Sequence, residues 1–349
     1  MPPDFLIDLT ALVTLLALLA YAVLGGADFG GGVWDIIATG PRAHAQRVAI
    51  AQSIGPVWEA NHVWLIFLIV LLFSAFPAAF ADLSIALYWP FHFVLAGIVL
   101  RGAAFVFSAH GRTVGRTPIA WGATFGAASV ITPLLLGAAL GAVSDGQIRV
   151  SNGTVTTAGT WAWVAPFSLA TGLLALAVCA YLAAFYLTLE TEGQLQEDFR
   201  ERALLVWLVA GGLALVTLVL TRFSAPYLWN GLVAGWPAIL VGTGILLAPA
   251  SFTAMYVRRY RLARVCAVGQ VIVLLVGWAL ALRPYLIYPD VTLAESAAPS
   301  ATLRFILITV PIGLALVLPS IWFLFSVFKG RNPASPDSSP GSTEQRPSA

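Results

Sequence analysis

The chain of 349 residues is 59% hydrophobic and only 10% charged, and its mean hydropathy is +0.88. Soluble domains are typically about 45–50% apolar and about 25% charged, so this composition excludes a cytosolic globular protein. The formal charge of +2 leaves no basic surplus for a polyphosphate backbone, which excludes nucleic acid as a partner. Cys179 and Cys266 lie far apart in apolar runs and predict neither a disulfide framework nor a metal site.

Continuous apolar stretches predict an all-α polytopic membrane protein. A bilayer core about 30 Å thick needs about 20 apolar residues per helix, and continuous runs lack the alternation of β-barrel strands. Four predicted spans precede the loop at 143–161, four follow it and one remains, which predicts two four-helix units and a peripheral helix. The nine predicted spans are 5–26, 57–76, 83–107, 118–142, 162–189, 203–221, 232–255, 262–282 and 303–328.

One integral membrane domain is predicted over residues 1–328, because no gap between spans has room for a soluble domain. Residues 329–349 contain no aromatic residue and no aliphatic residue larger than Ala, so this cytoplasmic tail is expected to be disordered. The connection at 190–202 holds seven charged residues in thirteen and predicts a solvated helix extension at the membrane surface. The loop at 143–161 is rich in Gly, Ser and Thr and is expected to be flexible.

The distribution of basic residues predicts a periplasmic N-terminus and a cytoplasmic C-terminus. With this orientation and alternating connections, fourteen of the eighteen Lys and Arg residues fall on the cytoplasmic side, Arg101 among them. The positive-inside rule favours this topology over its inverse. The first segment carries Asp4 and Asp8 where a signal peptide has basic residues, so it is predicted to be a retained helix.

A glycine-rich segment follows the first predicted span. It reads GGADFGGGVWD from Gly25 to Asp35 and places Asp28 among five glycines. A phosphate-binding loop is excluded because no strand precedes it and the Lys-Ser/Thr pair is missing, and the kinase Asp-Phe-Gly motif lacks its usual surroundings. Glycine permits close backbone approach, so we predict a tightly packed helix end that holds Asp28 near the inner membrane face.

A second polar motif opens the second span and reads SIGPVWEANHVWLI from Ser53 to Ile66. Pro56 suits a helix start, where no amide donor is needed. Glu59 and His62 are three residues apart and share a helix face. An ionisable residue at the edge of a span is a functional candidate, which makes Glu59 a candidate for proton relay on the same side as Asp28. The alternative is an ionised glutamate that caps the helix or meets lipid headgroups.

Haem or metal ligation by this chain is not expected. His44 and His110 fall in predicted loops, and only His62 and His92 lie within spans, at opposite ends of a helical hairpin. The chain has only two methionines, which argues against a His/Met pair. Asp82 falls in the short turn between the second and third spans, where solvation is the simplest expectation.

The GGADFGGG segment after the first span, followed by IGPVWEANHVWLI, resembles subunit II of the cytochrome bd family of ubiquinol oxidases. The polar positions at a helix entrance make this motif specific, and the length, the nine spans and the orientation agree over residues 1–328. The combination of Glu59 with Asn61 and His62 looks most like the cyanide-insensitive branch of the family.

This resemblance implies a heterodimer with a larger subunit I in the bacterial cytoplasmic membrane. Such a complex oxidises ubiquinol and reduces O2 to water with protons taken from the cytoplasm. In this family subunit I holds haem b, haem d and the quinol-binding loop, so the resemblance implies no cofactor or metal on this chain. Membrane lipid is a further expected partner, and the presence of small accessory subunits is left open.

The resemblance also implies roles for individual residues. Asp28 and Glu59 occupy acidic positions of the family motif, and the Glu59 position is associated with a proton path toward subunit I. Trp58, Asn61 and His62 are supporting motif residues. Many members carry an Asp where this chain has Gly25, so any relay that uses that carboxylate differs here.

Two other classes of function stay open on the residues alone. Secondary transporters often have Gly- or Pro-broken helices at the membrane midplane. Here the glycine cluster lies at a predicted helix end, and Pro90 and Pro133 are the prolines interpreted as mid-span, which argues weakly against a transporter. The other class is a pure scaffold subunit without a proton role. Only the activities of variants can distinguish it from a subunit that carries protons.

Overall fold

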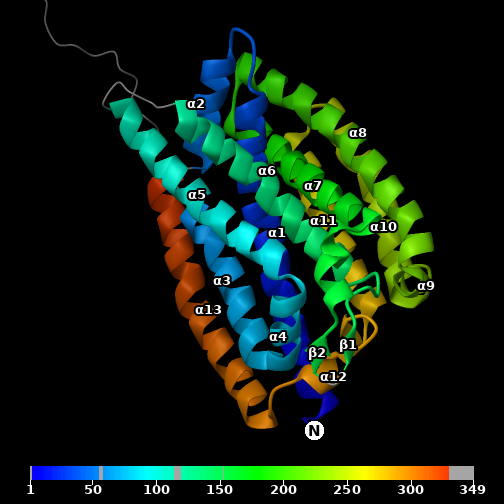
Figure 1. Cartoon of the computed structure of the whole chain (residues 1–349). Helices are drawn as coiled ribbons and strands as arrows, with labels where there is room; N and C mark the ends of the chain where they lie inside the picture. Colours follow the sequence, from blue (N-terminus) through cyan, green and yellow to red (C-terminus); the bar gives the residue numbers. More distant parts are fainter. Residues whose placement is uncertain (1, 55–57, 114–118, 152, 330–349) are drawn as a thin grey trace, which may run out of the picture.

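The chain folds almost entirely into long helices that lie side by side (Figure 1). The computed structural model describes residues 2–54, 58–113, 119–151 and 153–329, but not the side chains of 54, 58–60, 108–113, 119–120, 157–160, 321–322 and 324–329. The first half contains α1 (Asp4–Ile37), α2 (Ala43–Ile54), α3 (Trp58–Ala75), α4 (Pro77–Ala86), α5 (Tyr88–Thr113), α6 (Ile119–Ala142), β1 (Val150–Ser151), β2 (Thr154–Val155) and the 3-10 helix η1 (Thr157–Val164). The second half contains α7 (Pro166–Glu190), α8 (Gly193–Ser224), α9 (Pro226–Leu232), α10 (Gly235–Tyr256), α11 (Tyr260–Leu282), β3 (Tyr285–Ile287), β4 (Val291–Thr292), α12 (Leu293–Ser296) and α13 (Ser300–Lys329).

Eight described helices are long and apolar enough to cross a membrane, and the bent pair α3–α4 adds a ninth if it is one span. Helices α1, α3, α5 and α6 pack as one group, and α7, α8, α10 and α11 pack as a second. Contacts of α1 and α6 with α7 join the groups, while α13 lies at the edge against α1 and α3 (Figure 1). The predicted all-α membrane fold with two four-helix units and a peripheral helix is confirmed; the orientation stays a prediction.

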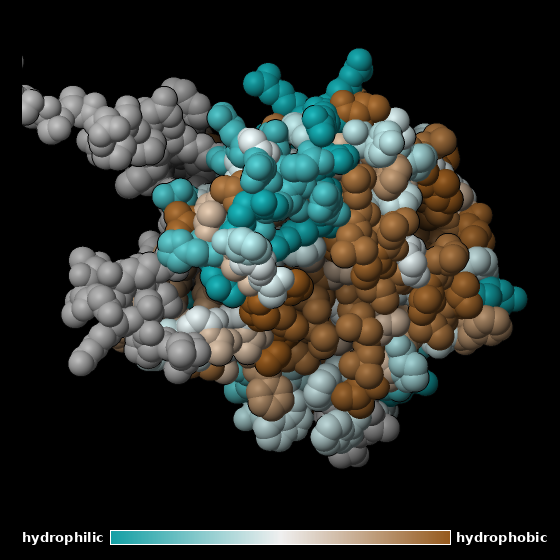
Figure 2. Space-filling view, turned by 90° about the horizontal axis from the view of Figure 1, so that it is seen from above, coloured by the Kyte–Doolittle hydropathy of each residue, from teal (hydrophilic) through white to brown (hydrophobic). Residues whose placement is uncertain are grey.

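The two ends and the flank of the molecule differ in polarity. Seen from the end that carries the α1–α2 and α7–α8 connections, hydrophilic residues gather over the end and hydrophobic residues cover the flank (Figure 2). The charged segment at 193–202 forms the first turns of α8, which confirms the predicted helix extension. The tail at 330–349 lies outside the described residues, so its disorder and the domain boundary stay predictions.

Helix α1 is longer than predicted. It continues without a break to Ile37, so the expected helix end near residue 26 was wrong and the glycine-rich segment is helical. Unwound backbone would leave amides and carbonyls without partners in hydrocarbon, which favours continuation of the helix. The glycines are also buried, so close packing offsets their low helix propensity.

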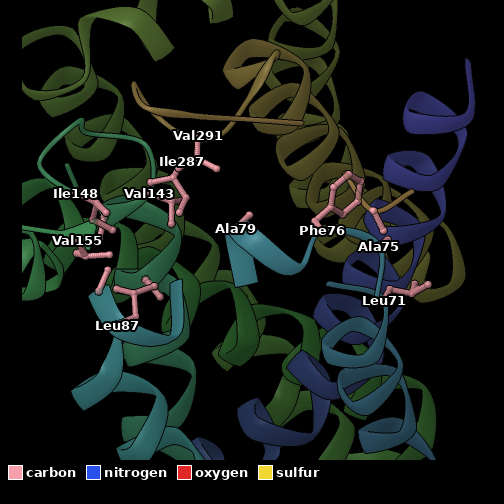
Figure 3. Packing of buried hydrophobic residues seen from close by; sticks show 14 of the residues in the cluster. Leu71, Ala75, Phe76, Ala79, Leu87, Val143, Ile148, Val155, Ile287 and Val291 are labelled. Carbon is pink, nitrogen blue, oxygen red and sulfur yellow. The ribbon is translucent and has the colours of Figure 1, made fainter. Parts of the chain in front are cut away.

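The chain turns sharply between α3 and α4, where the two helix axes differ by 117°. Pro77 begins α4, as expected for a residue that needs no amide partner at a helix start. Asp82 lies within α4 and is only 9% exposed, so the predicted solvated turn was wrong. The bend packs a buried hydrophobic cluster that includes Phe76 and Leu87 (Figure 3).

The described residues of the loop at 143–161 form paired strands and pack against a later loop, contrary to the expected flexibility. Strands β1 and β2 pair in it, and Ile148 and Val155 enter the same buried cluster as Ile287 and Val291 of the later loop (Figure 3). Arg149 forms an ion pair of 2.7 Å with Asp290, and the Tyr288 amide donates to the Val143 carbonyl at 3.1 Å. The two loops therefore support each other, which a Gly/Ser/Thr-rich composition alone does not reveal.

Asp145, in the connection after α6, provides a pH-dependent test of this packing. Burial raises its pKa from 3.8 to about 6, although its Oδ1 atom accepts a hydrogen bond from the Gln147 amide at 2.9 Å. The folded state therefore binds this proton more tightly than the unfolded state. The stabilising contribution is complete below about pH 4 and is lost as the pH rises through about 6.

Asp145→Asn is expected to abolish this part of the pH dependence, because the amide stays neutral and its oxygen can still accept from Gln147. The measurement is the thermal stability of the purified protein between about pH 4 and about pH 8. Parallel pH curves for the parent and the variant would show that Asp145 does not titrate with unfolding.

Candidate functional site

The glycine-rich face of α1 lets α6 and α7 approach the helix closely on either side of Asp28. A Cβ atom on Gly30 would collide with the backbone of Cys179 on α7, and one on Gly32 would collide with Ser129 on α6. Gly25 packs against the ring of Tyr21 one turn earlier. The glycines therefore remove side-chain bulk on both sides of Asp28, as the predicted role in close packing requires, although within a helix and not at its end.

Asp28 is buried in the interior of the first helix group, with only 3% of its surface exposed. The Nδ2 atom of Asn61 on α3 donates to the Asp28 Oδ2 atom at 2.7 Å and lies 3.4 Å from the Leu24 carbonyl. The two motifs singled out in the sequence, GGADFGGG and WEANH, therefore meet through this hydrogen bond.

Arg101 on α5 is the largest fully buried side chain among the described residues and is 1% exposed. Its Nη2 atom donates to the backbone carbonyl of Asp28 at 2.9 Å, and its Nε atom donates to Ser129 Oγ at 3.1 Å. The guanidinium carbon lies 4.8 Å from the ring centre of Phe29 and 5.0 Å from that of Phe125. This environment holds a cation beside the Asp28 carboxylate in the low-dielectric interior.

Sequence reasoning missed this role of Arg101 and counted the residue only toward the positive charge of the cytoplasmic side. The available signal was its position inside the apolar run 83–107, because an ionisable residue within a span is a functional candidate by default. The partners could not be inferred, since Asp28 and Ser129 lie on other helices. Without Arg101, the count of Lys and Arg residues still favours the cytoplasmic side, so the predicted orientation does not change.

His62 lies next to this cluster, and its ring centre is 6.3 Å from Tyr21 and 5.8 Å from Phe29. Trp58 and Glu59 belong to the first turn of α3, but their side chains lie outside the described residues. The predicted role of Glu59 in proton relay, on the same side of the membrane as Asp28, therefore stays a prediction.

The second helix group contains a buried polar cluster that is neutral. The Tyr181 hydroxyl donates to Gln270 Oε1 at 2.5 Å and lies 3.0 Å from Ser251 Oγ, which links α7, α10 and α11. These groups satisfy one another but carry no charge. The cluster of Asp28, Asn61, Arg101 and Ser129, which we call the Asp28 cluster, is thus the charged candidate for proton chemistry between the helices of the two groups, whereas the buried acids Asp82 and Asp145 lie in α4 and in the loop after α6.

The positions of His62 and His92 do not fit the ligation of one haem iron by both side chains. A haem iron with two protein ligands needs both imidazoles on opposite sides of one iron. His62 lies near the start of α3, whereas the chain reaches His92 only after the rest of α3, which is roughly 20 Å long at 1.5 Å per residue, and the bent α4. His92 is also exposed, and its Nδ1 atom lies 2.7 Å from the Tyr88 carbonyl.

Comparisons of the sequence with known proteins all point to the same family. The sequence profile described as cytochrome bd terminal oxidase subunit II matches residues 6–328. A cytochrome bd menaquinol oxidase subunit II of Bacillus subtilis is 25% identical over 323 residues, which are 88% of this chain and 91% of the relative. The cytochrome bd-I ubiquinol oxidase subunit 2 of Escherichia coli is 29% identical over 219 residues, which are 62% of this chain and 55% of that protein.

The fold also matches a solved structure. A chain in the structure of the bd oxidase from Geobacillus thermodenitrificans superposes with a TM-score of 0.77 at 23% identity. The match covers 94% of this chain and 100% of that chain. At this identity the likeness concerns the fold.

Proposed function

Because the chain belongs to the cytochrome bd terminal oxidase subunit II family, we propose that it supplies a proton path to a bd-type oxidase that couples ubiquinol oxidation to the reduction of O2. As a subunit of a cytochrome bd quinol oxidase, it is a multi-pass integral membrane protein and not a complete enzyme. The resemblance of its motifs to the family supports a heterodimer with subunit I in the cytoplasmic membrane.

The observation that carries the proton path is the Asp28 cluster. A carboxylate that is 3% exposed, bonded to Asn61 and placed beside a buried arginine is expensive to keep inside a membrane protein. Such intramembrane acids typically serve ion or proton pathways. The excess of basic residues at the α1–α2 and α7–α8 end supports proton entry from the cytoplasm.

We place haem b, haem d and the quinol-binding loop on subunit I. The poor fit of His62 and His92 to one iron supports this placement, and so does the motif resemblance. No step of haem chemistry is assigned to residues of this chain. Its proposed contribution is to complete the heterodimer with subunit I and to move protons toward it.

The identity of the quinol is a separate proposal. The E. coli relative is named for ubiquinol, whereas the B. subtilis relative that covers more of this chain is named for menaquinol. We propose ubiquinol from the motif resemblance. Faster turnover of the purified complex with a menaquinol than with a ubiquinol of equal chain length would overturn this choice.

Glu59→Gln tests the entrance of the proton path. Glutamine keeps the size and hydrogen-bonding capacity of the side chain but cannot carry a proton. The variant complex is expected to keep its haem spectrum and to consume O2 about tenfold more slowly. This loss is smaller than the about 10²–10⁴-fold typical of a proton-transfer group, because water can provide parallel routes. Glu59→Asp is expected to retain most activity, since the titrating group survives.

The matched control is Glu192→Gln, which neutralises an exposed glutamate in the α7–α8 connection and is expected to leave turnover unchanged. Rates are compared at equal haem content between about pH 6 and about pH 8, where a carboxyl relay is sensitive to the proton supply. A Glu59→Gln complex that turns over like the parent throughout would favour the scaffold alternative for this residue.

A further inference from the structure

A cavity of about 340 Å³ lies where the end of α1, the start of α2 and the first turns of α8 meet. Its walls include Arg42, Gln46, Asp198, Glu201 and Arg202. It lies at the hydrophilic end seen in Figure 2, outside the Asp28 cluster. The oxidase reaction proposed above assigns no role to it.

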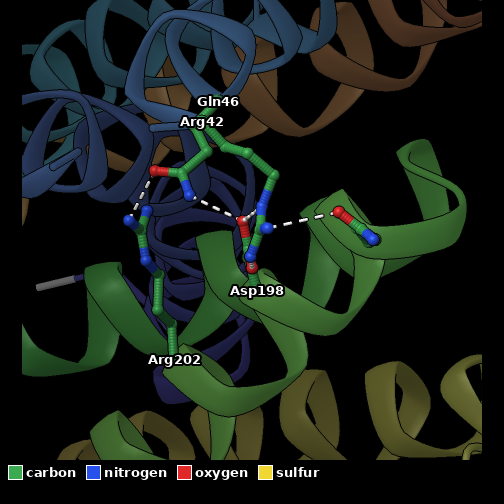
Figure 4. Close-up of polar contacts among 5 residues, drawn as sticks. Arg42, Gln46, Asp198 and Arg202 are labelled. Carbon is green, nitrogen blue, oxygen red and sulfur yellow. Dashed lines mark hydrogen bonds and ion pairs between the residues drawn. The ribbon is translucent and has the colours of Figure 1, made fainter. Parts of the chain in front are cut away.

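One pair of charges in this cavity is already matched. Arg42 donates to Asp198 through Nε at 2.8 Å and through Nη2 at 2.5 Å. The Nε2 atom of Gln46 adds a third hydrogen bond to Asp198 at 2.8 Å (Figure 4). Asp198 and Arg42 therefore form the fixed wall of the cavity, and neither brings an unmatched charge to a ligand.

Arg202 and Glu201 are a second pair of charged residues in the cavity, and neither forms an ion pair with a described side chain. Arg202 donates from Nη2 to Gln46 Oε1 at 2.6 Å (Figure 4), and its Nη1 atom is buried without a hydrogen-bond partner among the described residues. Glu201 is exposed and forms no ion pair with any described side chain. Residues adjacent on a helix do not face each other, so the two charges do not neutralise one another directly.

The position of the cavity along α8 fits the headgroup region of a membrane. The charged turns end at Arg202, and the following residues through 220 are apolar apart from one threonine and two glycines. Leu205 borders the cavity and is 61% exposed, and Leu208 and Val209 extend this exposed apolar surface by the next turn. The cavity therefore opens onto a surface suited to an acyl chain.

We propose that this cavity binds the head group of phosphatidylethanolamine. The lipid phosphate binds the Arg202 guanidinium, as phosphates do in basic pockets between membrane helices, and the primary ammonium binds Glu201. One acyl chain lies along Leu205 and Leu208. A zwitterionic head group matches one available cation and one available anion, whereas phosphatidylglycerol would place no positive charge beside Glu201.

The test uses the purified, delipidated membrane complex, titrated with phosphatidylethanolamine or phosphatidylglycerol of equal acyl chains and analysed by native mass spectrometry. The parent is expected to bind phosphatidylethanolamine about tenfold more tightly than phosphatidylglycerol. Glu201→Gln is expected to remove this preference by weakening phosphatidylethanolamine alone. Glu192→Gln, its matched control, is expected to keep the preference.

A second comparison tests the phosphate contact. Arg202→Gln is expected to weaken both lipids by about tenfold, whereas Arg261→Gln, at an exposed arginine on α11, leaves both unchanged. Equal binding of the two lipids by the parent, or a preference that survives Glu201→Gln, would overturn the proposal. Displacement of the lipid by millimolar inorganic phosphate would instead indicate a site for free anions, and would overturn it as well.

Discussion

The Asp28→Asn complex is expected to assemble with a normal haem spectrum and to consume O2 about 10²-fold more slowly than the parent. Asparagine has nearly the same shape as aspartate, and its oxygen can still accept the hydrogen bond from Asn61. Arg101 donates to the backbone carbonyl of residue 28, which the substitution leaves in place. The change therefore removes the proton-carrying group while it preserves the hydrogen bonds that the structure shows around it.

Asp4→Asn is the matched control, because it neutralises an exposed aspartate at the far end of the same helix. It is expected to leave turnover within error of the parent. Oxygen consumption is measured on purified complexes at equal haem content. Parent-like turnover of the Asp28→Asn complex would show that the proton path does not use Asp28, and would leave this residue with a structural role only.

The membrane fold was predictable because hydrocarbon restricts the chain so strongly. Every spanning segment must satisfy its own backbone, so length and hydropathy suffice to place the helices. The same restriction explains the error at α1. Five glycines and an aspartate are poor helix formers in water, yet here the chain has no favourable alternative to a helix and gains close contacts with α6 and α7.

The Asp28 cluster was predictable only in part. Asp28 and Asn61 stood out because polar residues beside apolar runs are unusual, and the structure brings these two together. Arg101 and Ser129 did not, because their contacts with the α1 segment connect positions far apart in the sequence. One sequence records which residue types are present but not which helices are neighbours. Likewise, the burial of Asp82 depends on the bend before α4, which no composition rule predicts.

Arg101→Met is expected to have the largest effect on stability, with a loss of about 3–5 kcal/mol and little intact complex recovered. Arg101 supplies a buried positive charge that acts on the Asp28 carboxylate, so its removal leaves that carboxylate uncompensated in the interior. The substitution also removes the hydrogen bonds from the guanidinium to the Asp28 carbonyl and to Ser129. The measurements are the yield of intact complex by size-exclusion chromatography and its thermal stability. Arg261→Met, at an exposed arginine of α11, is the control and is expected to behave like the parent.

Combining Arg101→Met with Asp28→Asn separates the structural role of the charge pair from its role in proton transfer. The double variant carries no unmatched buried charge, so it is expected to recover more intact complex than Arg101→Met alone and to unfold at a higher temperature. It still lacks the titrating carboxyl and is expected to remain slow in O2 consumption. A double variant no more stable than the sum of the two single changes would show that the charges are not coupled. Recovery of both stability and turnover would show that the pair serves packing alone, because a complex with no carboxyl at position 28 would then move protons at the normal rate.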